Sequence, residues 1–374
     1  MTVSPQAEAV IDLDAYRTNL ATLSALAPTS QAMAVVKANA YGHGMAQCAR
    51  AARDAGMEWL GVATLEEARL LRAGGDRGEI LCWLASPGAD FVEVIDSGIQ
   101  VTASSAGQFA DIVAAGKGRR PKIQLKVDTG LSRNGAAGEQ WPALVEAAAS
   151  AHRAGIAEIT GVWSHFACAD EPGNRANDAQ ETAFRKAVED LESVGLGHVM
   201  RHLSNSAAAL TRPSAHFDLI RLGIASYGLT PALGLEYNCK LKPVMTLRAR
   251  LAAVKRVPAG SGVSYGHTYV TSRETTLGLV PAGYGEGILR SASNKAEVQF
   301  AGERAPVAGI ICMDQFVVDL GDRPANVGDT VVLFGPGDDG EPTVADWAEA
   351  AGAITYEVVT RLGGRIQRTF QGER

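Results

Sequence analysis

The first two-thirds of the chain alternates short β-rich runs with amphipathic, alanine-rich stretches of helical period. Stretches such as GMAQCARAARDAG and EQWPALVEAAASAHRAG end in glycine, a common helix cap. The runs between them predict eight strands: Met33–Lys37, Trp59–Ala63, Glu79–Leu84, Ile99–Ala103, Lys122–Asp128, Glu158–His165, His198–Ser204 and Asp218–Gly223. Eight strands alternating with helices predict a (β/α)8 barrel, preceded by a strand and a helix within AVIDLDAYRTNLATLSAL.

An open doubly wound sheet is the competing arrangement, but it predicts a GxGxxG turn after the first strand that this chain lacks. Near residue 237 the helical stretches thin out, and runs such as VMTLRARLAAVKRV, TLGLVPAG, PVAGIICM and TVVLF dominate. They predict a mostly antiparallel β domain with one late helix at Val344–Ala351. We therefore expect a barrel domain over residues 1–236 and a β domain over residues 237–374, with the N-terminal strand a candidate to pack with the second domain.

Composition narrows the class of protein. Hydrophobic residues make up 46% of the 374 residues and charged residues 20%, as in globular proteins. The net charge of −6, without long runs of one sign, argues against nucleic acid or an anionic membrane as a partner. Five scattered cysteines without a CxxC pair predict neither a disulfide framework nor a structural zinc. Because we find no signal peptide and no membrane-spanning run, we expect a cytoplasmic protein.

Polar residues gather where the predicted barrel strands end, which is where (β/α)8 barrels carry their chemistry. They are Lys37 at the first strand, Lys126 and Asp128 at the fifth, His165 at the sixth, Ser206 after the seventh, and Arg221 with Gly223 at the eighth. Contributions from four or more strands to one rim are typical of a barrel enzyme.

Lys37 follows the apolar run AMAVV, so its amine is predicted to lie at the barrel mouth, partly shielded from water. Shielding disfavours the ammonium and leaves more free amine to attack a carbonyl. A lone lysine in such a loop is more often an ordinary residue. The NAYGHG that follows changes this balance, because two glycines and the hydroxyl of Tyr41 can closely approach a bound group.

The loops after the seventh and eighth strands are the common phosphate site of these barrels. RHLSNSAA and IRLGIASYG place Ser206, Gly223 and Ile224 there. Alone, NSAA is better explained as a helix N-cap. Together with a lysine nucleophile on the same rim, these residues predict a phosphate-bearing aldehyde cofactor.

Nine segments resemble those of bacterial alanine racemases, in the same order and spacing: AVVKANAYGHG, KVDTGLSRNG, WSHFACAD, HLSNSAA, IRLGIASYGLTP, GVSYGHTY, GYGEG, GIICMDQ and TYEVV. The resemblance extends from about residue 8 to residue 370. It implies pyridoxal 5'-phosphate on a (β/α)8 barrel followed by a β domain, and a head-to-tail homodimer with shared active sites. It also implies interconversion of L- and D-alanine, which supplies D-alanine for peptidoglycan synthesis.

The resemblance implies two bases, one on each face of the substrate. Lys37 forms an aldimine with the cofactor and becomes one base when the substrate displaces it. Tyr265 is the other, and His165 and Arg221 supply the cationic network that a tyrosine with a pKa of roughly 10 needs to act as a base. Arg221 also faces the pyridine nitrogen, where a group that can only donate keeps that nitrogen neutral and favours fidelity.

Further roles follow from the same resemblance. Arg133 holds the phenolic oxygen of the cofactor and approaches the substrate carboxylate. Lys126 matches a lysine that many members carry as a carbamate, an anion that attracts Arg133. Met313 offers its backbone N–H to the substrate carboxylate from the partner subunit. Tyr41 and Tyr356 lie near the phosphate, and Tyr356 also narrows the pocket.

Two positions depart from the family pattern. Ile310 stands where many members have an arginine at the substrate entrance, although Asp170 and Arg290 still match entrance residues. Glu286, in GYGEG, replaces the commoner aspartate. These departures put the electrostatics of the substrate entrance in question. They do not affect the predicted chemistry.

Three other functions stay open at this point. A basic amino-acid decarboxylase on the same fold needs a longer pocket and lacks a tyrosine base such as Tyr265. A non-catalytic pyridoxal-phosphate carrier is a bare barrel without this β domain. A racemase of broader specificity is usually exported, and this chain shows no export signal.

Overall fold

A computed structural model of the chain describes residues 5–373, so residues 1–4 and 374 of the two predicted domains lie outside the described part. Eight parallel strands form the N-terminal barrel in the order β8-β7-β6-β5-β4-β3-β2-β9. They are β2 (Gln31–Val35), β3 (Trp59–Val62), β4 (Glu79–Cys82), β5 (Gln100–Ala103), β6 (Lys122–Lys126), β7 (Glu158–Trp163), β8 (Met200–His202) and β9 (Leu219–Leu222). Asp218 and Arg221 donate backbone N–H groups to the carbonyls of Arg201 and Ser204, which closes the ring between β8 and β9. The (β/α)8 prediction is confirmed.

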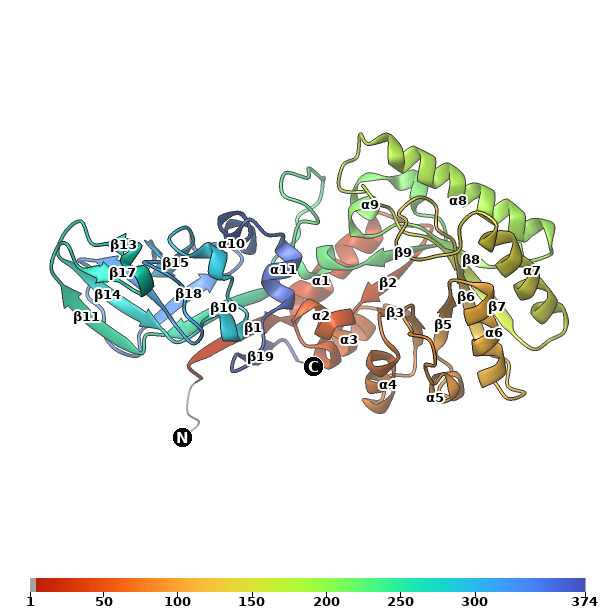
Figure 1. Cartoon of the computed structure of the whole chain (residues 1–374), viewed down its shortest axis with the longest axis horizontal. Helices are drawn as coiled ribbons and strands as arrows, with labels where there is room; N and C mark the ends of the chain where they lie inside the picture. The colour runs from red at the N-terminus through yellow and green to blue at the C-terminus, as the bar shows by residue number, and fades with distance from the viewer. Residues whose placement is uncertain (1–4, 374) are drawn as a thin grey trace.

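Helices surround the barrel (Figure 1). They are α1 (Leu13–Ala25), α3 (Met45–Asp54), α4 (Leu65–Ala73), α5 (Val92–Asp96), α6 (Ala106–Ala115), α7 (Gln140–Arg153), α8 (Arg175–Ser193) and α9 (Ser206–Thr211), with 3₁₀ turns η1 (Pro213–Ala215) and η2 (Ile224–Tyr227). All barrel strands but one end one or two residues earlier than predicted, because their last residues already belong to the rim loops. Within residues 5–373, no helix combines the length and apolar character needed to cross a membrane.

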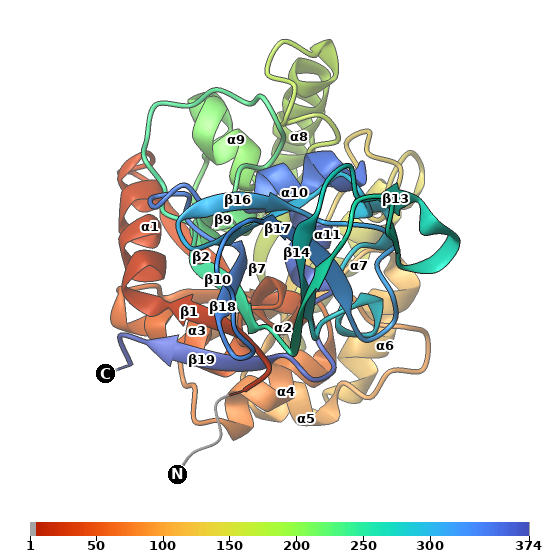
Figure 2. The same cartoon turned by 90° about the vertical axis from the view of Figure 1, so that its left-hand side faces the viewer.

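The C-terminal part is mostly antiparallel, as predicted. A six-stranded sheet has the order β16-β15-β18-β10-β1-β19, and a three-stranded sheet the order β11-β14-β17. Their strands are β1 (Ala7–Asp12), β10 (Met245–Arg250), β11 (Ala253–Val257), β14 (Thr275–Val280), β15 (Glu297–Phe300), β16 (Glu303–Pro306), β17 (Phe316–Gly321), β18 (Thr330–Phe334) and β19 (Gln367–Gln371). The N-terminal β1 pairs antiparallel with β10 and parallel with β19, so this sheet joins both ends of the chain (Figure 2).

Smaller elements complete the β domain. They are the strand pair β12 (Gly262–Val263) and β13 (Tyr269–Val270), the 3₁₀ turns η3 (Tyr265–His267), η4 (Tyr284–Glu286) and η5 (Arg290–Ala292), and the helices α10 (Val344–Ala351) and α11 (Thr355–Thr360). The prediction of α10 is confirmed. The prediction of a single late helix is wrong, because Gly352 at φ 65° ends α10 and the chain begins α11 three residues later.

The apolar run PVAGIICM was also misinterpreted as strand-forming, because residues 307–313 are mostly irregular. After Ala308, which still donates its N–H to Val317 of β17, two backbone donors of the run bond to side chains. Gly309 N–H donates to Asn294 Oδ1 at 2.6 Å, and Ile311 N–H donates to Ser293 Oγ at 3.0 Å. These acceptors satisfy the backbone without a strand pair.

Candidate active site

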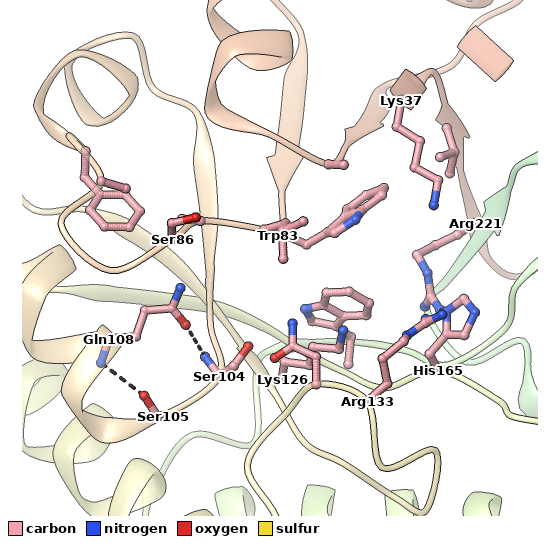
Figure 3. A pocket seen from close by; sticks show the side chains of 18 of the residues that line it. Lys37, Trp83, Ser86, Ser104, Ser105, Gln108, Lys126, Arg133, His165 and Arg221 are labelled. Atoms are coloured by element: carbon pink, nitrogen blue, oxygen red, sulfur yellow. Dashed lines mark hydrogen bonds between the residues drawn. The ribbon is translucent and has the colours of Figure 1, made fainter. Parts of the chain in front are cut away.

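A cavity of about 1240 Å³ opens at the carboxyl ends of the barrel strands (Figure 3). Its lining includes ten residues that the sequence singled out: Lys37, Tyr41, Lys126, Arg133, His165, Ser206, Arg221, Gly223, Ile224 and Tyr356. In Figure 3, Lys37, Arg133 and Arg221 gather around one end of this cavity. The other end continues past Ser86 and Gln108, between the loops that follow β4 and β5.

The chain leaves β2 in a left-handed turn that presents Lys37. In α2 (Lys37–Tyr41), residues 38–41 have φ between 52° and 55°. This conformation costs an L-residue roughly 1–2 kcal/mol. Glu67 of α4 offsets part of the strain, because its Oε1 accepts the N–H of Ala38 at 2.6 Å. Its Oε2 accepts two further N–H groups just after β3, so the turn is tied to the start of α4.

The amine of Lys37 lies in a largely buried and cationic setting. Burial and the nearby Arg133 lower its pKa, and Glu67 opposes them. Its Nζ is 5.8 Å from the ring centre of Trp83 and 5.9 Å from that of Tyr41. The lowered pKa increases the share of free amine, which is the form that attacks a carbonyl.

Lys126 is perturbed further than Lys37. Burial, Arg221 and Arg133 lower its pKa to about 7, because each disfavours a further positive charge. Its Nζ lies 4.2 Å from the ring centre of Trp163. A substantial share of this amine is therefore uncharged at neutral pH.

Arg221 has both terminal nitrogens occupied by protein acceptors. Nη1 donates to Nδ1 of His202 at 3.2 Å. Nη2 lies within 3.3 Å of the carbonyl oxygens of Ser164 and Leu203 and of Nδ1 of His165. Among residues 5–373 none accepts from Nε, so this N–H is left for a ligand in the cavity. Burial lowers the pKa of Arg221 to about 9, which leaves the side chain cationic at neutral pH.

His165 is held in one protonation state and one tautomer. Burial and Arg221 keep its pKa well below the usual value, so the ring is neutral at neutral pH. Because Nδ1 accepts from Arg221, the ring proton resides on Nε2. A neutral imidazole N–H backed by a guanidinium can stabilise an anionic oxygen.

The loops after β8 and β9 form a cradle of donors. The backbone N–H groups of Gly223 and Ala225 donate to Oγ of Ser206 at 2.9 and 3.4 Å. A Cβ on residue 223 would stand 2.5 Å from the hydroxyl of Tyr41, so only glycine allows this close approach. Burial raises the pKa of Tyr41 and keeps that hydroxyl protonated. Because Oγ of Ser206 already accepts the N–H groups of Gly223 and Ala225, the hydroxyls of Ser206 and Tyr41 are the donors of this cradle that suit a phosphate.

Tyr356 of α11 is the residue that the β domain of the same chain adds to the lining, among the described residues. Its ring centre is 6.1 Å from that of Tyr41. α11 and α2 pack so closely that a Cβ on Gly42 would stand 2.1 Å from the carbonyl oxygen of Val359. Burial and Asp170 raise the pKa of Tyr356, so Asp170 lies near this edge of the cavity without lining it.

Other residues predicted for the site lie outside the cavity of this chain. They are Tyr265, Met313, Arg290, Ile310 and Asp170. Tyr265 is 72% exposed and Met313 is 55% exposed. Their two loops are fastened together, because Oγ of Ser264 donates to the carbonyl of Ile310 at 2.7 Å. Figure 1 shows β13, which follows Tyr265, at the end of the β domain far from the barrel.

Four residues at the site were missed in the sequence: Trp83, Trp163, Glu67 and His202. The two tryptophans stand at the ends of β4 and β7, a position that could have identified them. Glu67 forms a capping box with Thr64, so its sequence pattern indicates only a helix start. His202 offers no local signal, because its partners are distant along the chain.

Comparison with known proteins covers both parts of the chain. Residues 11–231 match the N-terminal domain of alanine racemase, and residues 244–370 match its C-terminal domain. The alanine racemase of Salinispora arenicola is 50% identical over 372 residues, which cover 99% of each chain. The chain belongs to the alanine racemase family.

Solved structures of the alanine racemase family share the fold. That of the enzyme from D-cycloserine-producing Streptomyces lavendulae has a TM-score of 0.97 at 51% identity, covering 100% of this chain and 98% of the other. That of the Bartonella henselae enzyme, with covalently bound pyridoxal phosphate, has a TM-score of 0.89 at 30% identity, covering 98% and 100%. Alanine racemases are pyridoxal-phosphate-dependent isomerases.

Glu286, which departs from the usual alanine racemase pattern, has a clear structural role. Its Oε2 accepts the N–H of Gly283 at 2.9 Å, and its Oε1 pairs with Arg365. Arg365 also reaches Asp314, the neighbour of Met313, at 2.5 Å. The longer carboxylate therefore closes its own turn and anchors the arginine beside the Met313 loop.

Proposed function

We propose that this chain interconverts L- and D-alanine with two bases on opposite faces of the substrate, Lys37 from its own barrel and Tyr265 from a second copy. One observation carries the proposal. A single cavity holds a half-buried lysine with a lowered pKa and Arg221, whose Nε–H is left for a ligand. D-Alanine made in this way would serve peptidoglycan synthesis.

The cavity offers residues for both ends of pyridoxal phosphate, the phosphate and the aldehyde. Ser206, Tyr41 and the backbone of Gly223 and Ile224 would hold the phosphate, and the absence of a Cβ at residue 223 provides the room. Lys37 would hold the aldehyde end, as the covalent attachment in the Bartonella henselae enzyme suggests. When bound, the cofactor withdraws electrons from the α-carbon of the substrate and makes its hydrogen acidic.

Lys37 is suited to accept and return the α-hydrogen on one face. Its lowered pKa brings the neutral and charged amine closer in population near neutral pH, as a general acid-base group requires. Lys37 is half-buried and lines the cavity, so its amine can meet a substrate there.

The second base has to come from another subunit. Tyr265 and Met313 are largely exposed and lie outside this chain's cavity. A two-fold dimer that places each β domain over the partner's cavity brings them to the open face of the site. There the Nε2–H of His165, backed by Arg221, would stabilise the phenolate and allow Tyr265 to act as a base. The backbone N–H of Met313 would bind the substrate carboxylate.

Arg133 and Lys126 would bind the carboxylate and the phenolic oxygen from the barrel side. With a pKa of about 7, the Nζ of Lys126 is neutral often enough to add CO₂ and lose a proton. The carbamate formed would replace repulsion of Arg133 by attraction. It would hold the guanidinium in a bidentate pair and aim its remaining donors at the substrate.

Arg221 would preserve the fidelity of the reaction. Its Nε–H can only donate, so a ring nitrogen that it faces stays unprotonated. A cofactor ring whose nitrogen is unprotonated takes up less negative charge. Protons would therefore be returned to the α-carbon of the substrate in preference to the cofactor. Tyr356 narrows the cavity toward a small side chain, and Asp170, Arg290 and Ile310 would line the substrate's approach in the dimer.

Chiral analysis of L-alanine incubated with the holoenzyme tests the function, with serine and lysine in parallel. We expect conversion of alanine to equal amounts of the two enantiomers, and little conversion of lysine. Equal rates with serine and lysine would indicate a broad-specificity racemase, and bound cofactor without conversion would indicate a carrier. Borohydride reduction and peptide mapping should find the cofactor on AVVKANAYGHG, and a label on any lysine other than Lys37 would contradict the proposal.

A further inference from the structure

A row of polar side chains runs through the barrel beneath the active site. Glu79 and Gln100 are the first residues of β4 and β5, Gln124 lies in the middle of β6, and His202 ends β8. Gln100 is 3% exposed, and Gln124 and His202 are fully buried. The starts of parallel strands lie at the face opposite the active site, so the row extends from that face up to Arg221.

Each member of the row is hydrogen-bonded to the next. Nε2 of Gln100 lies 2.8 Å from Oε2 of Glu79, and Nε2 of Gln124 lies 3.0 Å from Oε1 of Gln100. Nε2 of His202 lies 2.7 Å from Oε1 of Gln124, and Nη1 of Arg221 lies 3.2 Å from Nδ1 of His202. Four consecutive bonds therefore connect a carboxylate to a guanidinium.

The chemistry of the two ends dictates the direction of every bond between them. A guanidinium can only donate, so Nδ1 of His202 accepts and the ring proton resides on Nε2. That proton is donated to the oxygen of Gln124, whose amide nitrogen donates to the oxygen of Gln100. The amide nitrogen of Gln100 then donates to Glu79, which as a carboxylate can only accept. The carboxylate at one end and the guanidinium at the other therefore require the same orientation of the two glutamine amides.

Neighbouring groups are compatible with this orientation. The hydroxyl of Thr160 can donate to Oε1 of Gln100 at 2.7 Å, the oxygen that Gln124 uses, or to the carbonyl of Ile123 at 3.4 Å. The ring of His202 stacks on Trp163 with an angle of 6° between planes and 5.6 Å between centres. Burial and Arg221 keep the pKa of His202 well below its usual value, so the ring is neutral and carries a single proton.

We propose that Glu79, Gln100 and Gln124 are positioning residues that hold His202 in its Nε2–H tautomer and thereby fix the guanidinium of Arg221. Reversal of the two amides would move the ring proton to Nδ1, where two donors would face each other. Arg221 would then lose the acceptor of its Nη1 and be held by the acceptors of Nη2 alone. The consequence for catalysis rests on the proposed function of Arg221, whereas the tautomer itself does not.

Two variants at Gln100 separate the effect of hydrogen-bond direction from the effect of a change in packing. In Gln100→Lys the ammonium pairs with Glu79 but presents a donor to Gln124, so Gln124 must turn and drive the His202 proton to Nδ1. The swap Glu79→Gln with Gln100→Glu moves the carboxylate one place along the row and leaves Gln124 its acceptor. Both proteins keep one carboxylate in the row and have altered packing at the same position.

The tautomer is read directly from ¹⁵N NMR of the imidazole rings in the holoenzyme, which has seven histidines. The His202 signals are assigned by their loss in His202→Gln. We expect the Nε2–H tautomer in wild type and in the swap, and the Nδ1–H tautomer in Gln100→Lys. Transamination per racemisation turnover should rise about tenfold in Gln100→Lys only, the size of one hydrogen bond to a charged group.

An Nδ1–H ring in wild type, or an unchanged tautomer in Gln100→Lys, would overturn the proposal. If Gln100→Lys does not fold, Gln124→Met removes the acceptor of the Nε2 proton without adding a donor. Arg221 alone then selects the tautomer, so a share of the Nδ1–H form should appear, and a ring that stays purely Nε2–H would contradict the role of the row. Failure of wild type to racemise alanine would overturn the proposed function and leave the tautomer result unaffected.

Discussion

The two halves of the proposed site differ in how completely one chain assembles them. On the barrel side, Arg221 is buried and hydrogen-bonded, Lys37 is half-buried beside aromatic rings, and both have lowered pKa values. On the β-domain side, Tyr265 and Met313 are largely exposed and contact no part of this cavity. A single chain thus assembles the barrel side of the proposed site, whereas the β-domain side of the proposal depends on a second chain.

Removal of Lys37 should lower activity the most, because it removes the proposed base on the barrel side of the site. Lys37→Ala should lower kcat/KM for alanine by about 10²–10⁴-fold or more, the usual contribution of a general acid-base group. The measurement is the rate of D-alanine formation. Lys186→Ala, which removes an exposed amine on α8, is the control. Retention of more than about a tenth of the activity by Lys37→Ala would remove Lys37 from the mechanism.

Mixing two inactive variants tests whether the halves meet between chains. Lys37→Ala damages the barrel side of every site and Tyr265→Ala the β-domain side. In a mixed dimer with sites shared between subunits, one site receives both lesions and the other receives neither. Unfolding and refolding an equal mixture should therefore restore about a quarter of wild-type activity, because half of randomly paired dimers are mixed. No recovery would show that each site is built within one chain.

Glu67→Ala should lower activity by disturbing the barrel side of the proposed site, although the proposed base Lys37 remains. The variant frees three backbone N–H groups and releases the left-handed turn that presents Lys37. We expect kcat to fall about tenfold to a hundredfold, because small misplacements of a reacting group are costly. The matched control is Glu66→Ala, which changes the adjacent and exposed carboxylate. Equal kinetics for the two variants would show that the turn holds its shape without Glu67.

Substitution of Lys126 should have the smallest effect, and this effect is on the stability of the folded protein. Its pKa is about 7 in the folded chain and about 10.4 when unfolded, so the folded state binds fewer protons between these values. Stability therefore rises with pH through this window, and the cost of the buried charge is fully present below pH 7. In carbonate-free buffer, Lys126→Met should have a higher Tm than wild type at pH 6, with a difference that shrinks toward pH 10. A constant difference would contradict the lowered pKa.

The alternation of short β-rich runs and amphipathic helices predicts the barrel well, because that order along the chain is itself the pattern of a (β/α)8 barrel. Apolar character alone failed at residues 307–313, where Gly309 and Ile311 donate their N–H groups to the side chains of Asn294 and Ser293. It also missed α11, where a glycine cap separates two short helices. In both places the partner of the backbone, and not the apolar pattern, decides the local structure.

The sequence by itself determined the fold class, the family and the rim residues such as Lys37, because these depend on local pattern and on order along the chain. Only the tertiary structure decided how those residues behave. The lowered pKa of Lys126 comes from burial and from Arg221 and Arg133, and Arg221 lies far from it in the sequence. The direction of the row from Glu79 to Arg221 needs contacts among five strands. Desolvation and hydrogen-bond direction are properties of neighbours in space, and no local pattern encodes them.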